Sequence, residues 1–177
     1  LGLHTQGRRQ RRRRRRPLRI VVSACLLGRA CRYDGASKPK PDALTRFGEG
    51  VEWAPVCPEE LGGLGTPRPG ADLRGGDGAA VWRGEAKVLR EADDLDVTAA
   101  FCAGAERAWA LAGAPDAALL KARSPSCGVG TTHIDGQVQR GDGVFAALLR
   151  AKGVPLIDDE AALISGPPSS APSARRG

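Results

Sequence analysis

Three of the five cysteines stand where a thiol could take part in chemistry. Cys57 lies in V-C-P-E-E-L-G-G-L and Cys127 in S-P-S-C-G, while Cys25 directly follows an apolar segment. Polar loops rich in proline and glycine place a side chain at a backbone turn rather than in an apolar interior. We therefore expect metal binding or catalysis from these thiols before disulfide formation. From their spacing alone, burial as small hydrophobic side chains explains them equally well.

The available ligands favour an iron–sulfur cluster over zinc. Structural zinc normally takes four ligands, often as close pairs such as C-x-x-C. The sequence has no such pair and only two histidines, His4 and His133. A cubane cluster needs one thiolate for each iron if every iron is to be fully ligated by the protein. Three thiolates would leave one iron open to a substrate, and an open metal can act as a Lewis acid. A zinc-binding or purely structural module is the alternative.

The remaining two cysteines are weaker candidates. Cys102 stands beside Phe101 in a helical pattern, and we predict that it belongs to the core. Cys31 follows Cys25 in the segment L-G-R-A-C-R-Y-D-G. We favour a structural role for Cys31 over the role of a spare ligand.

The three candidate ligands each follow a segment that is predicted to be a buried strand. Short apolar runs indicate these strands at residues 19–24, 51–56 and 117–121. Strands that alternate with helices predict an α/β fold, here a Rossmann-like three-layer sandwich with a mainly parallel sheet. Ligands bind beyond the carboxyl ends of the strands in such sheets. We therefore expect the three cysteines to converge at that edge.

Helices, hairpins and a last strand complete the predicted fold. Helical spacing and capping residues predict helices at residues 42–48, from Asp96 or Thr98 to about Leu111, and at 143–152. Hairpins are expected at residues 79–90, turning at Arg83–Gly84, and at 131–139, turning at Asp135–Gly136. A strand at 154–157 precedes a helical turn from Asp158. In this scheme the hairpins are additions to a single sheet.

The net charge of +7 comes from the two ends of the chain. Residues 1–17 hold eight arginines and residues 166–177 add Arg175 and Arg176, so 17 basic and 20 acidic residues remain between them. We therefore predict a disordered Arg-rich arm at 1–17, one folded domain at 18–165 and a disordered Pro/Ser-rich tail at 166–177. The arm could bind nucleic acid, but we favour no role, because no aromatic residue interleaves its arginines.

The length of 177 residues suits one domain whose core needs no disulfides. No apolar run reaches the length of a membrane helix, and the first residues lack the apolar stretch of a signal peptide. We expect a cytoplasmic protein without a membrane partner, in a compartment where thiols stay reduced.

Four segments of the sequence resemble one known family. The thiouracil desulfurase family has motifs similar to V-S-A-C-L-L-G-R-A-C-R-Y-D-G at 22–35, P-V-C-P-E-E-L-G-G-L-G-T-P-R-P at 55–69, K-A-R-S-P-S-C-G at 121–128 and G-D-G-V-F-A-A-L-L at 141–149. The resemblance spans about residues 18–162, which is nearly all of the predicted folded domain.

The resemblance implies a [4Fe-4S] cluster held by Cys25, Cys57 and Cys127. It further implies that the open iron takes the sulfur of 2-thiouracil and that water replaces this sulfur, which gives uracil without net redox change. Glu59 and Ser124 correspond to the acid–base or substrate-positioning residues. Such chemistry needs a soft Lewis acid for the sulfur and a group that handles protons.

Several residues near these motifs have structural alternatives to a functional role. Glu60 is placed as well as Glu59. Substrate contacts are predicted for Ser23, Asp34 and Ser126. Asp34 could instead form an Asx-type turn, and the serines of S-P-S-C could cap backbone groups. Lys121 and Arg123 could offset the negative charge of a cluster or lie exposed.

The sequence thus predicts an iron–sulfur enzyme that desulfurates a small thioamide, such as the thiolated pyrimidine 2-thiouracil. The alternative is a non-catalytic, redox-sensing iron–sulfur protein whose Arg-rich arm binds nucleic acid. A fourth protein ligand such as Cys31 would favour the sensor, whereas an open iron beside a polar pocket would favour the enzyme.

Overall fold

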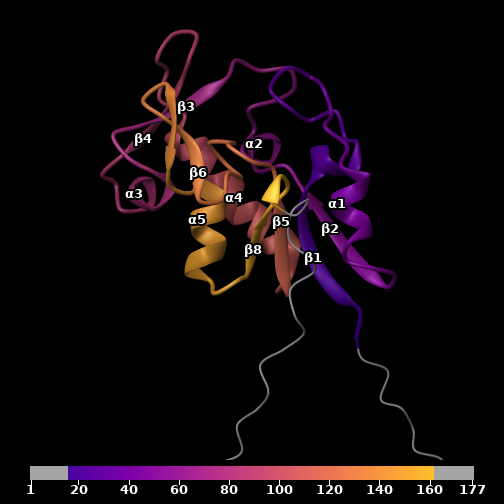
Figure 1. The fold of residues 1–177 in the computed structure, drawn as a ribbon. Helices are drawn as coiled ribbons and strands as arrows, with labels where there is room; N and C mark the ends of the chain where they lie inside the picture. The colour runs from indigo at the N-terminus through magenta and orange to yellow at the C-terminus, as the bar shows by residue number, and fades with distance from the viewer. Residues whose placement is uncertain (1–15, 162–177) are drawn as a thin grey trace, which may run out of the picture.

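The chain folds into an α/β domain with two four-stranded sheets, in a computed structural model that describes residues 16–161 (Figure 1). The first sheet has the strand order β2-β1-β5-β8, and all of its strand pairs are parallel. Its strands are β1 Leu18–Ser23, β2 Val51–Val56, β5 Ala117–Leu120 and β8 Leu156–Asp158. The predicted α/β class and parallel sheet are confirmed, and the finer Rossmann-like three-layer arrangement stays a prediction.

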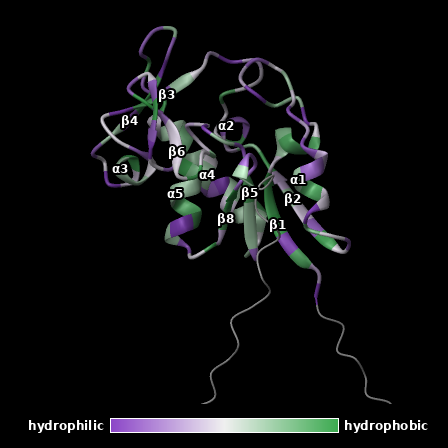
Figure 2. Cartoon of the chain, viewed as in Figure 1, coloured by the Kyte–Doolittle hydropathy of each residue, from purple (hydrophilic) through white to green (hydrophobic). Residues whose placement is uncertain are grey.

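The apolar strand β1 is buried on both faces of this sheet. Successive side chains of a strand point to opposite faces, so Val21 packs in one core cluster and its two neighbours pack in another. The Val21 cluster includes residues of α4, Thr98–Ala112, and of α5, Val144–Ala151. The other cluster includes a residue of α1, Pro41–Thr45. Figure 2 shows the hydrophobic stretch of β1 that both clusters share.

The second sheet is mixed and has the order β4-β3-β6-β7. Its strands are β3 Ala71–Arg74, β4 Lys87–Arg90, β6 Thr131–Ile134 and β7 Gln137–Arg140. The predicted hairpin at 131–139 is confirmed as β6 and β7, with Asp135 (φ 51°) and Gly136 (φ 77°) in the turn. Because β6 also pairs in parallel with β3, this hairpin is part of a second sheet and not an addition to the first.

The predicted hairpin at residues 79–90 is wrong in its first half. Residues Gly78–Trp82 form a helix, α3, and the Asp77 carboxylate caps it by accepting a hydrogen bond from a backbone amide of its first turn (3.1 Å). The Trp82 indole donates to the Val144 carbonyl at 2.9 Å, so a contact with α5 holds the helix in place. Only the second half of the segment is a strand, β4.

Strand β4 pairs in antiparallel fashion with β3, which the sequence analysis missed. The β3 segment, A-D-L-R, is half charged and has no β-branched residue, so its composition does not indicate a strand. Its pairing with β4 on one side and β6 on the other makes it a strand. Residues of β3 therefore form a strand because of their pairing within the sheet, and not because of their local strand propensity.

The other predicted elements are present with shifted ends. The helices expected at 42–48, at 96 or 98 to 111 and at 143–152 are α1, α4 and α5, and the strand expected at 154–157 is β8. Two short helical segments are additional: η1, Ala24–Leu27, and α2, Pro58–Leu61. Each of them directly follows a strand of the parallel sheet.

Most of the predicted arm and the whole predicted tail, residues 166–177, lie outside the described residues. Arg16, which the sequence analysis assigned to the arm, forms an ion pair with Asp116. Within residues 16–161, no helix has both the length and the hydropathy that a membrane crossing requires.

Helix α4 packs closely on α2 through two glycines. A Cβ atom on Gly104 would lie 1.9 Å from the Pro58 carbonyl oxygen, and one on Gly62 would lie 2.3 Å from the Ala100 carbonyl oxygen. Any side chain at these positions would overlap the backbone of the facing helix. The contact therefore fixes α2 against α4, directly after the end of β2.

We predict that Gly104→Ala lowers the free energy of unfolding by about 1–3 kcal/mol, because the added methyl group forces α4 away from α2. Thermal unfolding followed by circular dichroism measures the loss. Ala110→Ser, at an exposed position of the same helix, is the control and should change the stability by less than about 0.5 kcal/mol. An unchanged melting temperature for Gly104→Ala would contradict the close contact.

Candidate metal centre and active site

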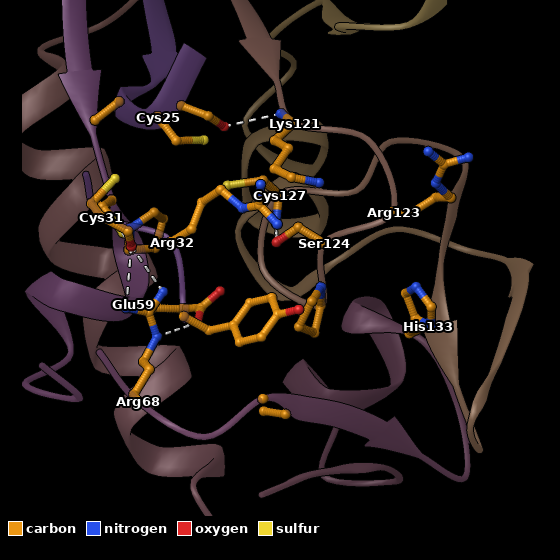
Figure 3. A pocket seen from close by; sticks show the side chains of 18 of the residues that line it. Cys25, Cys31, Arg32, Glu59, Arg68, Lys121, Arg123, Ser124, Cys127 and His133 are labelled. Atoms are coloured by element: carbon orange, nitrogen blue, oxygen red, sulfur yellow. Dashed lines mark hydrogen bonds and ion pairs between the residues drawn. The ribbon is translucent and has the colours of Figure 1, made fainter. Parts of the chain in front are cut away.

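The carboxyl ends of three parallel strands bring Cys25, Cys57 and Cys127 to one cavity. Strands β2, β1 and β5 are neighbours and run in the same direction, so the segments that follow them meet at one edge of the sheet. Cys25 lies in η1 after β1, Cys57 precedes α2 after β2, and Cys127 follows β5 by a short loop. All three line a cavity of about 330 Å³ (Figure 3). The predicted convergence is confirmed.

Cys31 lies in the same cavity as a fourth thiol. Its side chain is buried, and its sulfur lies within 4.8 Å of the Cys57 sulfur and of a Glu60 carboxylate oxygen. The Cys57 thiol also donates to the Cys31 carbonyl oxygen, at 3.6 Å. The structure thus places Cys31 beside the predicted ligands. At this position Cys31 could serve as a ligand, which is the alternative to a structural role. Cys102, in contrast, packs against the core from α4, as predicted.

The surroundings of these thiols favour their protonated form. Burial raises the pKa of the Cys127 thiol to about 12, opposed by a hydrogen bond from the Ser23 hydroxyl. A hydrogen bond with Cys25 is the main cause that raises the pKa of Cys31 to about 11. The pKa of Cys57 is raised by its hydrogen bond with Cys31 and then by burial. A metal that binds these thiols therefore has to displace their protons.

The loop that carries Cys127 is held by the amino-terminal end of α5. The Gly143 amide donates to the Gly128 carbonyl (2.8 Å), and the Val144 amide donates to the Pro125 carbonyl (2.9 Å). The first amides of a helix have no partner within it, so these loop carbonyls satisfy them. A Cβ atom on Gly143 would lie 2.5 Å from the Ser126 carbonyl, so only glycine allows this approach.

The two serines of S-P-S-C have different positions. Ser124 lines the cavity, and its hydroxyl oxygen accepts hydrogen bonds from the amides of Ser126 (3.2 Å) and Cys127 (3.1 Å). The predicted capping role is therefore present, and the hydroxyl proton is still available for donation. Ser126 is buried behind the cavity lining, and its hydroxyl oxygen has no hydrogen-bond partner among residues 16–161.

The structure separates Glu59 from its rival Glu60. Glu59 lines the cavity and accepts a hydrogen bond from the Arg68 guanidinium at 2.7 Å. Glu60 is not among the residues that line the cavity. One of its carboxylate oxygens accepts from the Thr66 hydroxyl (2.7 Å), and the other pairs with Arg29 (2.9 Å). Glu59 and Glu91 are the carboxylates that line the cavity, whereas a Glu60 oxygen lies within 4.8 Å of the Cys57 sulfur.

Of the other predicted substrate contacts, Ser23 lines the cavity and Asp34 does not. Ser23 also accepts a hydrogen bond from the Lys121 amide at 3.0 Å. The Asp34 carboxylate accepts from the amide of Ala36 at 3.0 Å and pairs with Arg32 at 3.1 Å. These contacts match the Asx-turn alternative for Asp34 and not a contact with substrate.

Cationic side chains line the cavity together with the thiols. The lining includes Arg32, Arg68, Lys121 and Arg123. Burial lowers the pKa of Lys121, and the positive charge of Lys38 adds to this effect. Arg123 pairs with Glu160 at 2.6 Å and is exposed. These cations can balance the negative charge of a metal centre held by thiolates.

The lining also includes residues to which the sequence analysis assigned no role, among them Arg32, Tyr33, Arg68, Glu91 and His133. The first three lie inside the motifs at 22–35 and 55–69, so their position beside the motif cysteines was the available signal. The Arg32 guanidinium lies 5.9 Å from the centre of the Tyr33 ring. His133 comes from β6, in the second sheet, and no signal in the sequence places that sheet beside the first.

Known proteins resemble this chain over most of its length. Residues 20–161 match the 2-thiouracil desulfurase family. The uncharacterized protein YbbK of Bacillus subtilis (strain 168) is 37% identical over 145 residues, which cover 79% of this chain and 95% of that protein. The solved structure of TudS, a [4Fe-4S]-dependent thiouracil desulfidase, is 41% identical with a TM-score of 0.63, and the match covers 81% of this chain and 91% of that one. The chain belongs to the 2-thiouracil desulfurase family.

Proposed function

We propose that this chain is a [4Fe-4S]-dependent desulfidase that converts a thiolated pyrimidine such as 2-thiouracil into uracil. Water supplies the oxygen, and the sulfur leaves as hydrogen sulfide, so the reaction has no net redox change. The observation that carries the proposal is the convergence of the cysteine thiols in a cavity that Glu59 and Ser124 also line. The 41% identity to TudS supports the same reaction class.

The donor set fits a cluster of this kind. We assign Cys25, Cys57 and Cys127 as its ligands, because each follows one of three adjacent parallel strands. The unpartnered hydroxyl of Ser126 is a donor that sulfur atoms of a cluster could accept. When bound, the cluster supplies a soft Lewis-acidic iron for the sulfur of the substrate.

Glu59 and Ser124 provide the polar chemistry of the cavity. The Ser124 oxygen already accepts two backbone amides, so its proton is directed away from them and can be donated to a substrate atom. Glu59 has one carboxylate oxygen bound to Arg68 and can use the other to move a proton on water or on the ring nitrogen. The volume of about 330 Å³ suits a small heterocycle.

The second candidate function is a non-catalytic iron–sulfur protein, and the position of Cys31 is the observation that favours it. A cluster held by Cys31 as well as by the other three thiols would have no open iron. We favour the enzyme, because an electron carrier or sensor has no need of a carboxylate and a hydroxyl beside the cluster. We also propose a cytoplasmic location, where thiols stay reduced.

The function is tested on protein that has been purified and reconstituted without oxygen. We expect about four iron and four sulfide per chain, as in a [4Fe-4S] cluster, and release of hydrogen sulfide and uracil from 2-thiouracil. Uracil is measured by chromatography and sulfide by a colorimetric assay. A colourless protein loaded with zinc would refute the cluster, and a loaded cluster without sulfide release would favour the sensor.

Alanine substitutions test the ligand assignment. Cys25→Ala, Cys57→Ala and Cys127→Ala should each abolish the cluster absorption and the sulfide release, because three thiolates are the minimum that the proposal allows. Cys31→Ala should keep both, and Cys102→Ala in α4 is the matched control. Full cluster content in any one of the first three variants, or its loss in Cys31→Ala, would overturn the assignment.

A pair of neighbouring substitutions tests the role of Glu59. Glu59→Gln should lower kcat by about 10²–10⁴-fold, because it removes the group that moves the proton. Glu60→Gln should lower kcat far less than Glu59→Gln, because the Glu60 carboxylate is bound to Thr66 and Arg29 and does not line the cavity. One Glu60 oxygen lies within 4.8 Å of the Cys57 sulfur, so the cluster content of this variant is measured first. Steady-state kinetics at equal cluster content measure kcat for both variants. A large loss in Glu60→Gln together with a small loss in Glu59→Gln would assign the role to Glu60.

A further inference from the structure

We propose that Arg68 is a positioning residue for the reaction and acts through Glu59; this inference rests on the proposed function. The Arg68 Nε donates to Glu59 Oε2 at 2.7 Å, and the two side chains are only 6% and 15% exposed. Such a buried pair is held far more firmly than an ion pair at the surface. Figure 3 shows Arg68 on the side of Glu59 that faces away from Ser124.

The remaining donors of Arg68 are also occupied. Its Nη1 donates to the carbonyl of Gly65 (2.8 Å) and to the Thr66 hydroxyl (3.2 Å), and Nη1 and Nη2 both reach the carbonyl of Cys31 (3.2 and 3.1 Å). The Arg68 amide donates to the carbonyl of Tyr33 at 2.8 Å. Because a guanidinium is planar and rigid, these bonds fix the direction of its Nε–H group.

These hydrogen bonds of Arg68 determine which carboxylate oxygen of Glu59 is anchored and which is available in the cavity. Its Oε2 is bound to Arg68, and no hydrogen bond holds its Oε1 within residues 16–161. One carboxylate oxygen is thus anchored and the other is available. A general acid or base must lie within hydrogen-bond reach of the proton that it moves, and small displacements of such a group cost large factors in rate.

Arg68 also joins two of the three segments that carry the cavity cysteines. It is bound to Glu59 in α2, two residues after Cys57, and to the carbonyl of Cys31 in the loop after Cys25. A purely structural role as a clamp between these segments is the competing explanation. The two explanations differ in whether the loss of Arg68 matters when Glu59 can no longer act.

A double-mutant cycle separates them. Arg68→Gln should lower kcat by about 10–100-fold, because Glu59 loses its anchor. In a Glu59→Gln background, Arg68→Gln should cost less than about threefold, since there is no longer a proton-moving group to position. Equal losses in both backgrounds would assign Arg68 a structural role and overturn the proposal. All rates are compared at equal iron and sulfide content.

Two further variants show whether a loss of rate in Arg68→Gln comes from a folding defect. Arg68→Lys keeps the positive charge but not the guanidinium geometry, and it should hold the cluster while it loses part of the rate. Arg107→Gln is the matched control, because Arg107 also holds α2, through the Leu61 carbonyl (2.6 Å), but is exposed and lies away from the cavity lining. It should leave kcat unchanged within about twofold.

A crystal structure of the loaded Arg68→Gln protein gives a readout that does not depend on activity. The Glu59 carboxylate should turn away from its position in the unsubstituted protein. An unchanged Glu59 position would overturn the proposal even if the protein releases sulfide. Conversely, if the unsubstituted, cluster-loaded protein is inactive, the proposed function fails, and the position of Glu59 in this structure still decides whether Arg68 anchors it.

Discussion

Backbone hydrogen bonds between β1 and its parallel neighbours β2 and β5 hold three distant parts of the chain at one edge of a sheet. The cavity depends on this pairing, because the segments after the three strands supply the thiols that line it. A register shift of one residue would also move the apolar side chains of β1 from one face to the other. Two core clusters pack against those faces, so the register is fixed by the same burial that stabilises the fold.

Around this edge, the surrounding elements satisfy polar groups that would otherwise be buried without partners. The first amides of α5 bind carbonyls of the Cys127 loop, and Arg68 binds the carbonyl of the buried Cys31. Unpaired buried polar groups are costly, so each such bond restricts the loops more than an exposed bond would. The thiols and the carboxylate therefore lie on loops that are held nearly as firmly as the strands before them.

The parallel sheet and the convergence of the three cysteines were predictable, because apolar runs mark buried strands and parallel strands share a binding edge. The second sheet was not predictable in the same way. Strand β3 has no local strand preference, and the α3 segment depends on a cap at Asp77 and on the contact of Trp82 with α5. The position of His133 in the cavity follows from where the second sheet lies relative to the first, and no spacing in the sequence predicts it.

The same topology has a consequence for biogenesis. Cys25, Cys57 and Cys127 lie 32 and 70 positions apart, so no short stretch of the unfolded chain contains two of them. Closing loops of this length costs entropy that local contacts cannot offset early in folding. The three assigned ligands therefore come together only after β1, β2 and β5 have paired, so a site that holds the cofactor through all three exists only once the sheet has formed.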